Sequence, residues 1–443
     1  MKPSKISIRV GLVFLIIVTV VLAVRAVFNS TEGRKLTLTL AEFKEKGMPI
    51  SAKDLAAPCP DADNAARLWK AAENLLLADK DEKELLGRAL LDVVAAKPMD
   101  PTNRAALTGL VAKNERALQL LYEMAGKPCF LLRDPGAQLP LATFPNAVKM
   151  ILAGRLLGFD ALLRAEEGDL ESAIIKIRLG LEFGPMFARE GTLITHLVAV
   201  ADARLLTYFL AAICRDKRIK DDALLQLIAG LDPGPWRGRL AYSIAGERAL
   251  GLERGSGLIQ GKFEGMAEET KTNRLLYWLL RPVIKSEIRR RLKEYDGWEQ
   301  IAAEPYFRQR ASLKTFEESL GRVPWYFKLT GYWEGAGNIA AFFLKNAMLE
   351  ATFLASRTGL ACRLYKSRTG AYPKNLEALV PGILSEVPVD PFTGKPLVYR
   401  REGEGFIVYS LGSNEKDDGG RGTWSITQAV MDKDDDWTWR ESR

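Results

Sequence analysis

The chain has 443 residues, of which 47% are hydrophobic, and it carries a formal net charge of +8. A chain of this length is expected to form about three domains, and its apolar content is ample for a sizeable core. The positive charge is spread along the chain without a basic motif interleaved with aromatic residues. Nucleic-acid binding is therefore excluded from the predicted functions.

The first 30 residues predict a membrane anchor. An uncharged, mostly apolar run extends from Val10 to Val24, and two further apolar residues follow soon after Arg25. The run is shorter than the roughly 20 residues that span a hydrocarbon core, but the Arg25 side chain can snorkel and lengthen the usable segment. The basic residues that precede the run are Lys2, Lys5 and Arg9. They predict that the N-terminus stays in the cytoplasm and that everything after residue 29 is exported.

A cleaved signal peptide is the alternative to this anchor, because Val24-Arg25-Ala26 is an acceptable cleavage site of small residues. We favour the uncleaved anchor, because the apolar run is at the upper limit of length for the apolar region of a signal peptide. The predicted location is therefore the inner membrane. A single span through residues 10–28 is expected, with the C-terminal part in the periplasm.

Residues 31–335 are predicted to form a helical domain of antiparallel hairpins, because Leu, Ala and Val recur at three- and four-residue steps. Within it, residues 161–184 contain a helix, a Gly168-Asp169 turn and a second helix whose Ala173 faces the first. This spacing resembles a single tetratricopeptide-like hairpin, although a hairpin within a helical bundle explains it equally well. No second copy follows at a fixed period, so an extended solenoid is not predicted.

Four cysteines lie far apart in the sequence: Cys59, Cys129, Cys214 and Cys362. They form no C-x-x-C pair and no cluster with histidine, which argues against a structural zinc site. In an oxidising compartment they can form one or two disulfides, and four cysteines allow three pairings. The sequence does not choose among these pairings, and buried free thiols are equally compatible with it.

The single histidine and the densest basic patch both have structural explanations. His196 lies in an apolar helical segment, which favours a hydrogen-bonded core or interface histidine over a catalytic one, and no G-x-S-x-G elbow accompanies it. The basic patch consists of Arg289, Arg290, Arg291 and Lys293. It can contact anionic lipid or a cell-wall polymer, but a solvated helix face is the favoured interpretation.

The best enzymatic candidates are two glutamates in a helical context, Glu247 and Glu253, followed by Gly257-Leu258-Ile259-Gln260. The last four residues faintly resemble the G-L-M-Q segment of lytic transglycosylases, exported helical enzymes that act on peptidoglycan. In that family one buried glutamate acts as acid and then base, because the substrate's own N-acetyl group replaces the second carboxylate. The E-S pair of the family is absent here. We therefore expect both glutamates to be surface carboxylates paired with Arg248 and Arg254.

Residues 336–443 are predicted to form a small α+β domain. A helix over residues 337–366 leads into it and ends before Gly370 and Pro373, since glycine favours a left-handed cap and proline cannot continue the helical hydrogen bonds. Two apolar runs at residues 396–400 and 405–410 then predict an antiparallel hairpin that packs on this helix. The loop that follows the hairpin crowds carboxylates among glycines, which indicates a hard cation.

The order of these residues resembles the globular head of the type II secretion major pseudopilin. In that family a long helix is followed by a G-x-Y-P turn, a D-P-(F/W)-G-x-P-x-x-Y loop, a strand ending in S-L-G and a calcium-binding loop. The matching residues are Gly370, Tyr372, Pro373, Asp390, Pro391, Phe392, Gly394, Pro396, Tyr399, Tyr409, Ser410, Leu411, Gly412, Gly419 and Gly420. The resemblance covers under a quarter of the chain. A true pseudopilin has a glutamate as the fifth residue of the apolar helix that follows its leader glycine, whereas Gly11 is followed by Leu12 to Ile16 without a glutamate. The apolar helix also does not run directly into the head, so the chain is expected to carry a pilin-like head without being a pilin.

The resemblance implies a calcium site. In that family a backbone carbonyl of the S-L-G segment, an aspartate just after it and acidic residues nearer the C-terminus hold the ion. Carried over, this nominates the Leu411 carbonyl, Asn414, Asp417 or Asp418, and one of Asp434, Asp435 and Asp436. Asn414 replaces the family's first aspartate, and the lost charge is expected to weaken binding. The alternative is a solvated acidic turn followed by a charged tail.

The order of anchor, helical body and pilin-like head resembles uncharacterised membrane-anchored envelope proteins of bacteria. The predicted function is therefore a non-enzymatic binding or structural role in the envelope, linked to secretion or surface assembly, with an unknown envelope protein as partner. The alternative is a peptidoglycan-cleaving enzyme similar to lytic transglycosylases that uses Glu247 or Glu253. The two functions differ in whether these carboxylates are needed.

Overall fold

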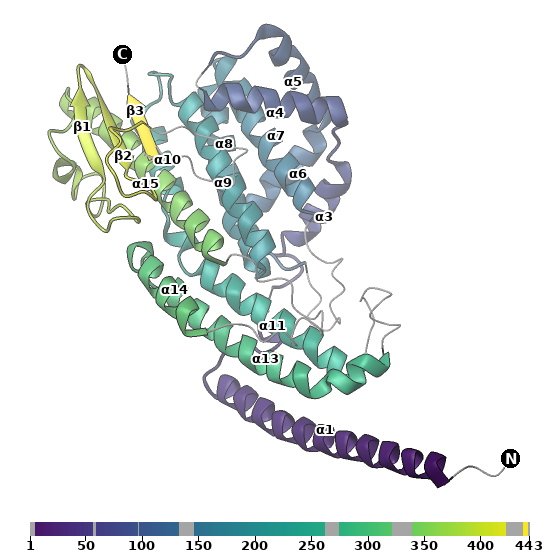
Figure 1. The fold of residues 1–443 in the computed structure, drawn as a ribbon. Coiled ribbons are helices and arrows are strands. Elements are labelled where there is room, and N and C mark those ends of the chain that lie inside the picture. Colours follow the sequence, from purple (N-terminus) through teal and green to yellow (C-terminus); the bar gives the residue numbers. More distant parts are fainter. Residues whose placement is uncertain are drawn as a thin grey trace. The chain divides into compact units, whose positions relative to one another are not determined.

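The structure is a computed structural model that describes residues 5–55, 59–95, 97–132, 146–261, 274–320, 339–421 and 437–441. Within these residues the chain is mostly helical, with one small antiparallel sheet near the C-terminus (Figure 1). This confirms the predicted fold class in its coarse form, mainly α with a small C-terminal β element. The chain divides into unit 1, residues 1–57, 244–299 and 315–337, and unit 2, residues 58–243, 300–314 and 338–443. The expected domains were 1–30, 31–335 and 336–443.

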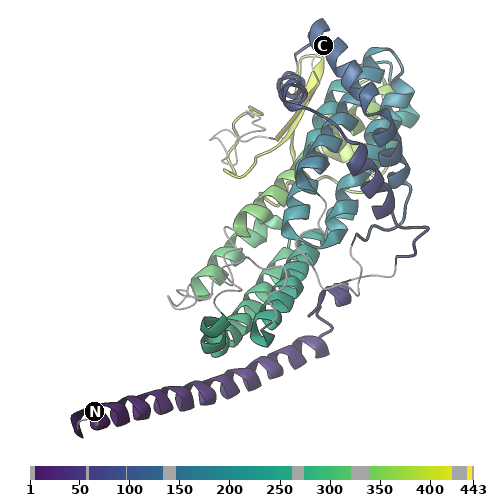
Figure 2. The same cartoon turned by 90° about the vertical axis from the view of Figure 1, so that its right-hand side faces the viewer.

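Unit 1 is built on α1 (Lys5–Glu45), which Figure 2 shows as one unbroken helix. A helix of 41 residues is about 60 Å long, twice the thickness of a hydrocarbon core. Its second half packs on α11 (Arg239–Gln260) and α13 (Arg274–Ala302), and the short α2 (Ala52–Leu55) follows it. The buried residues of this core are Leu36, Phe43, Leu252, Leu258, Ile284, Ile288 and Leu292.

Three of the described helices are long and apolar enough to cross a membrane: α1 from Leu12 onward, α9 (Leu193–Ile213) and α15 (Ile339–Thr369). The most apolar stretch of α1 is entirely exposed, whereas more than half of the corresponding stretch in α9 and in α15 is buried inside the protein. Because an exposed apolar helix is unstable in water, α1 is the one best suited to a lipid environment. This agrees with the predicted N-terminal anchor.

The basic patch on α13 is an ion-pair network. Arg290 and Arg291 each form ion pairs with both Glu287 and Glu294, whose side chains are almost fully buried. Arg289 pairs with the buried Glu32 of α1. A buried carboxylate is costly unless it is paired, so these arginines are needed by the interior of unit 1. The prediction of a solvated basic face was therefore wrong for the three arginines.

Unit 2 contains most of the remaining helices. These are α3 (Ala66–Leu75), α4 (Lys80–Val94), α5 (Pro101–Lys113), α6 (Glu115–Ala125), α7 (Ala147–Glu166), α8 (Leu170–Phe187), α9, α10 (Asp221–Gly230) and α15, with the start of α14 (Tyr306–Leu320). Several begin at residues whose side chains accept hydrogen bonds from the first free N–H groups, namely Asp79, Asp100, Asn146, Asp169 and Thr192. Short polar side chains at these positions therefore set where the helices start.

Helices α7, α8 and α9 form the centre of unit 2. The predicted hairpin is present: α7 and α8 are joined at Gly168, whose φ of 90° favours glycine, and Ala173 is fully buried. A Cβ atom on Gly158 of α7 would lie 2.2 Å from the ring of Phe209 on α9. Glycine at this position therefore lets α7 and α9 approach closely, as small residues do at helix contacts.

The sheet consists of β1 (Val398–Glu402), β2 (Gly405–Ser410) and β3 (Trp437–Glu441), all antiparallel, with β2 in the middle. The first two strands confirm the predicted hairpin, with Val398 opposite Tyr409. Strand β3 was not predicted, because its residues follow the acidic residues 434–436 and the sequence there is typical of a charged tail. All six residues of β2 are buried, as expected for a central strand covered by a helix.

Helix α15 lies between the other helices and the sheet, since it packs on α9 and α10 and also on β2 and β3. A Cβ on Gly359 would lie 2.2 Å from the indole of Trp439, so β3 rests directly on the helix backbone there. The buried Arg363 donates hydrogen bonds to the carbonyls of Cys214 and Asp216 after α9 and faces Glu441 of β3 at 3.8 Å. Both faces of α15 are thus fixed by packing and by charge.

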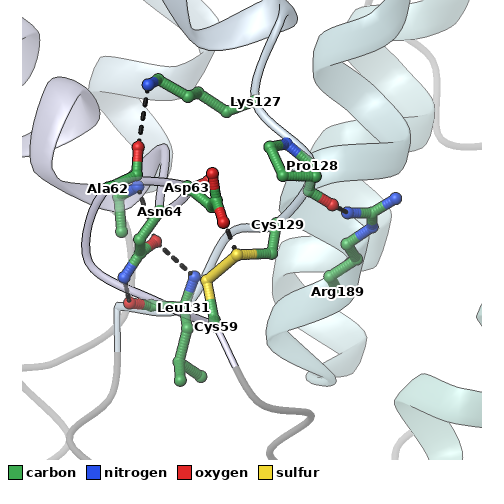
Figure 3. Close-up of a disulfide and its surroundings, with 10 residues drawn as sticks. Cys59, Ala62, Asp63, Asn64, Lys127, Pro128, Cys129, Leu131 and Arg189 are labelled. Atoms are coloured by element: carbon green, nitrogen blue, oxygen red, sulfur yellow. Dashed lines mark hydrogen bonds between the residues drawn. A yellow bond between two sulfur atoms is a disulfide. The ribbon is translucent and has the colours of Figure 1, made fainter.

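A disulfide joins Cys59 and Cys129 (Figure 3). Cys214 and Cys362 are buried free thiols. The Asn64 side chain bonds both the N–H and the carbonyl of Leu131, each at 2.9 Å. The Ala65 N–H also donates to the Cys129 carbonyl. The cross-link therefore reinforces two segments that backbone and amide hydrogen bonds already hold together.

Breaking this disulfide is expected to destabilise unit 2. The cysteines are 70 residues apart. A cross-link over a loop of this size lowers the entropy of the unfolded chain, which stabilises the folded state by about 4 kcal/mol. Cys59→Ser with Cys129→Ser should therefore lower the midpoint of thermal unfolding, measured by circular dichroism in detergent. Wild type in reductant should match the double variant, and Cys214→Ala with Cys362→Ala should remain sensitive to reductant. Equal midpoints with and without reductant in wild type would contradict this expectation.

Candidate functional site

The buried carboxylate of Asp390 joins two loops at the C-terminal end of β2. Its Oδ1 accepts hydrogen bonds from the Ser410 hydroxyl at 2.8 Å and the Phe392 N–H at 2.9 Å, and its Oδ2 accepts from the Leu411 N–H at 2.9 Å. Burial raises the pKa of Asp390, although these hydrogen bonds oppose the shift. The D-P-F-T-G motif and the S-L-G motif therefore meet at one side chain.

The D-P-F-T-G loop itself is a closed turn. The Gly394 N–H donates to the Asp390 carbonyl at 2.9 Å, and the Asp390 N–H donates to the Lys395 carbonyl at 2.7 Å. Gly394 has a φ of 69°, which a residue with a Cβ rarely adopts. The ring of Phe392 packs on Ala347 and Ala351 of α15. The loop is thus held on the helix by an aromatic anchor and on β2 by a carboxylate.

Four of the nominated calcium ligands lie on the loop after β2. The Asn414 side chain donates to Asp418 Oδ2 at 2.7 Å and accepts from the Lys416 N–H at 2.8 Å. Asp417 Oδ1 accepts from the Tyr409 hydroxyl at 2.8 Å and from the Gly419 N–H at 2.9 Å. The Tyr409 hydrogen bond lowers the pKa of Asp417, so this carboxylate is ionised at neutral pH.

The donor chemistry of this loop fits a hard cation in part. Carbonyl, amide and carboxylate oxygens are the ligands that calcium takes, and the loop supplies them from Leu411, Asn414, Asp417 and Asp418. However, no three His, Cys, Asp or Glu residues of the described chain lie close enough together to hold a metal ion. Asp434, Asp435 and Asp436 lie outside the described residues. When bound, calcium would supply a charge that holds the loop together, and the carboxylates of Asp417 and Asp418 would be its anionic ligands.

The two candidate glutamates lie on α11, six residues apart. Glu247 and Glu253 are both half-buried. Arg248, which was expected on the surface, is buried; it forms an ion pair with Glu299 and donates to the Pro49 carbonyl. The expectation of a surface pair for Arg248 was wrong, because its guanidinium completes the interior of unit 1. The similar G-L-I-Q segment forms the last turn of the helix, where Leu258 enters the core.

His196 is a core residue, as predicted, but the predicted hydrogen bonding is not confirmed, because both ring nitrogens are buried without a hydrogen-bond partner in the described part of the chain. It is 1% exposed on α9, with the ring of Trp236 edge-on at 6.2 Å. The pKa of His196 is lowered to about 4, mainly by burial and also by the charge of Arg239, while the Asn346 amide opposes the shift. The imidazole is therefore neutral at pH 7 and sealed from solvent, which does not suit a general base acting on a substrate.

A pocket of about 430 Å³ in unit 2 was not found by sequence reasoning. It lies between α4, the segment after it, α7 and the end of α9, and its charged lining residues are Asp92, Lys97, Glu166, Arg215, Asp216 and Arg218. Burial raises the pKa of Glu166 and lowers the pKa of Arg215. Both signs of charge are present, so the lining suits a small polar group. These residues share no motif, and only folding brings them together.

Comparisons with known proteins leave the family open. No protein-family model matches the chain, and neither the curated proteins nor the solved structures contain a match. The resemblance of residues 370–420 to pseudopilin heads therefore stays a hypothesis from motif order. In this chain the D-P-F-T-G and S-L-G motifs form one hydrogen-bonded unit around Asp390.

Removing the Asp390 carboxylate is expected to destabilise the C-terminal part strongly. Asp390→Ala leaves three buried donors without an acceptor, each loss costing about 1–3 kcal/mol, whereas Asp390→Asn keeps one acceptor oxygen and should cost less. Thermal unfolding of the variants in detergent with a chelator measures the difference. Asp417→Ala, at an exposed carboxylate, is the control and should lower stability by under about 1 kcal/mol. Equal midpoints for Asp390→Ala and Asp417→Ala would refute the role given to Asp390.

Proposed function

We propose that this protein is a membrane-anchored, exported envelope protein with a non-enzymatic binding or structural role. The exposed apolar stretch of α1 carries the proposal, because it precedes a folded body and has no protein covering in unit 1. The part of α1 after Glu32 enters a protein core. One helix thus contains both an apolar segment that suits lipid and a segment that packs in the core of unit 1. This is expected of a membrane anchor that is not cleaved from the folded protein.

Export to the periplasm is supported by two features. Basic residues precede the apolar run, and such residues are retained on the cytoplasmic side. The pairing of Cys59 with Cys129 suits an oxidising compartment, where disulfides form and persist. A single span is favoured by the burial of α9 and α15, whose apolar stretches are more than half covered by protein.

The binding role is inferred from the C-terminal part. Its motif order is similar to that of pseudopilin heads, and its turn, helix and strands form one unit around Asp390. We infer that this unit, with calcium at the loop of residues 411–418, presents a surface to a secretion or surface-assembly component. The buried, neutral His196 and the structural pairing of Arg248 support a non-enzymatic role.

Export predicts a defined thiol count in cells. Cells that make the full-length chain are quenched with acid and the protein is denatured. A mass-adding maleimide should then modify two cysteines, Cys214 and Cys362, and it should modify all four cysteines after reduction. A chain that lacks residues 1–30 stays in the reducing cytoplasm and should show four modified thiols in both cases. The number of modified cysteines is measured from the mobility of the protein in a denaturing gel. Four modified thiols in the unreduced full-length chain would contradict export with this disulfide.

Calcium binding tests the head separately from the anchor. Calorimetric titration of the full chain in detergent should show one site, and calcium at 100 times its dissociation constant should add about 2.7 kcal/mol of stability. Asp417→Ala with Asp418→Ala should abolish binding. Asp221→Ala with Asp222→Ala, another adjacent aspartate pair, should leave it unchanged. Absence of binding at millimolar calcium would remove the ion from the proposal and leave the anchor untouched.

A further inference from the structure

The first turns of α13 carry an exposed apolar face. Leu275 is 71% exposed, and Leu276, Trp278 and Leu279 are each more than a third exposed. Arginines at positions 274 and 281 bound this run of six apolar residues. Soluble proteins rarely expose a contiguous apolar patch of this kind unless something binds to it.

This face lies beside the apolar run of α1. The guanidinium of Arg25 sits 3.6 Å from the ring centroid of Trp278 and donates a hydrogen bond to its carbonyl. Further along, Lys285 donates to the Asn29 carbonyl at 3.1 Å. Residue numbers rise together on both helices, so α1 and α13 run in the same direction. The residues before Trp278 are therefore level with the end of the apolar run that precedes Arg25.

Three cations gather at the same level: Arg25, Arg281 and Lys285. None of them forms an ion pair with a carboxylate among the described residues, and the Nε atoms of Arg25 and Arg281 are buried without a hydrogen-bond partner. Burial lowers the pKa of Lys285, and the charges of Arg281 and Arg25 lower it further. Clustered cations with unused donors indicate an anionic ligand.

We propose that the start of α13 is a second membrane contact. Leu275, Trp278 and their apolar neighbours enter the interface of the leaflet in which the apolar run of α1 ends, while Arg25, Arg281 and Lys285 hold the phosphate of an anionic lipid headgroup. This inference rests on α1 being the anchor of the proposed function. It goes further by assigning a lipid-binding role to a segment 250 residues away in the sequence.

The bilayer fits this face better than a second copy of the chain. The apolar face continues that of α1, whose run is shorter than the roughly 20 residues that usually span a membrane. Tryptophan prefers the membrane interface, and basic groups at that depth attract anionic lipid. A twofold contact between two copies would instead place the same three cations opposite one another, which like-charge repulsion disfavours.

Depth measurement by spin labelling tests the apolar contact. The full chain is reconstituted in nanodiscs in a Cys214→Ala, Cys362→Ala background, with a nitroxide at Leu275→Cys. Collisions with oxygen should exceed those with a water-soluble nickel chelate severalfold. A label at Val20→Cys on α1 reports on the anchor, and a label at Leu91→Cys, an exposed leucine of α4, should show the opposite ratio.

The outcomes separate the inference from the anchor. Lipid exposure at both Val20 and Leu275 supports the inference. A lipid-exposed Val20 with a water-exposed Leu275 overturns it and leaves the anchor standing, whereas water exposure at both overturns the anchor too. Shielding of Leu275 from both reagents, with dipolar broadening between labels, would assign the face to a second copy and overturn the lipid contact.

Lipid retention tests the headgroup contact. Native mass spectrometry of the full chain from mixed bilayers should find phosphatidylglycerol retained severalfold over phosphatidylcholine. Arg281→Gln with Lys285→Gln should bring the ratio of retained phosphatidylglycerol to retained phosphatidylcholine close to one. Lys80→Gln with Lys83→Gln, which changes an exposed basic pair on α4, should leave this ratio unchanged. An unchanged preference in the first variant would overturn the headgroup assignment.

Discussion

The packing of α15 on two sides is the interaction on which unit 2 depends. One side of the helix meets α9 and α10, and the other meets the sheet, where Gly359 lets the indole of Trp439 lie on the helix backbone. Arg363 ties the carbonyls at the end of α9 to Glu441 of β3. The C-terminal sheet and the helical body therefore share one core, and a change at Gly359 would be felt by both.

Buried charge is used structurally in both units. Asp390 binds three donors in the C-terminal loops, and the Asp160 carboxylate on α7 accepts from Tyr122 and Lys176, each at 2.7 Å. In unit 1, the buried Arg248 is compensated by Glu299. Because each of these groups is already paired, they specify the fold. The cations beside the exposed face of α13 differ, since no carboxylate of the described chain pairs with them.

This difference connects the architecture to the proposed role. A single apolar helix holds a protein at the membrane but leaves its rotation and tilt free, because nothing else is fixed at the interface. A second interfacial contact from α13, locked to α1 by Arg25 and Trp278, would restrict both. Such a restriction would fix the orientation of unit 1 at the membrane, which suits the proposed role in the envelope.

Local sequence rules were sufficient for several features. The apolar run after Arg9, the turn at Gly168 and the β1–β2 hairpin were predictable because each depends on neighbouring residues or on a simple period. The core position of His196 followed from its apolar surroundings. The pairing of Cys59 with Cys129 was left open, since only the fold decides which cysteines meet.

The features that sequence could not supply depend on distant residues. Arg289 looked like part of a solvated patch, yet the carboxylate that pairs with it, Glu32, is on α1. Arg290 and Arg291 pair with Glu287 and Glu294 of the same helix, and these pairs are at helical spacings that the sequence contains. Strand β3 became a strand only because β2 offers it an open edge and α15 a surface for Trp439. By itself the sequence determined the N-terminal apolar helix, the helical content and the hairpin, which are encoded locally. Tertiary structure alone decided that Glu32 compensates Arg289 and which apolar faces stay exposed, because both depend on residues far apart in the chain.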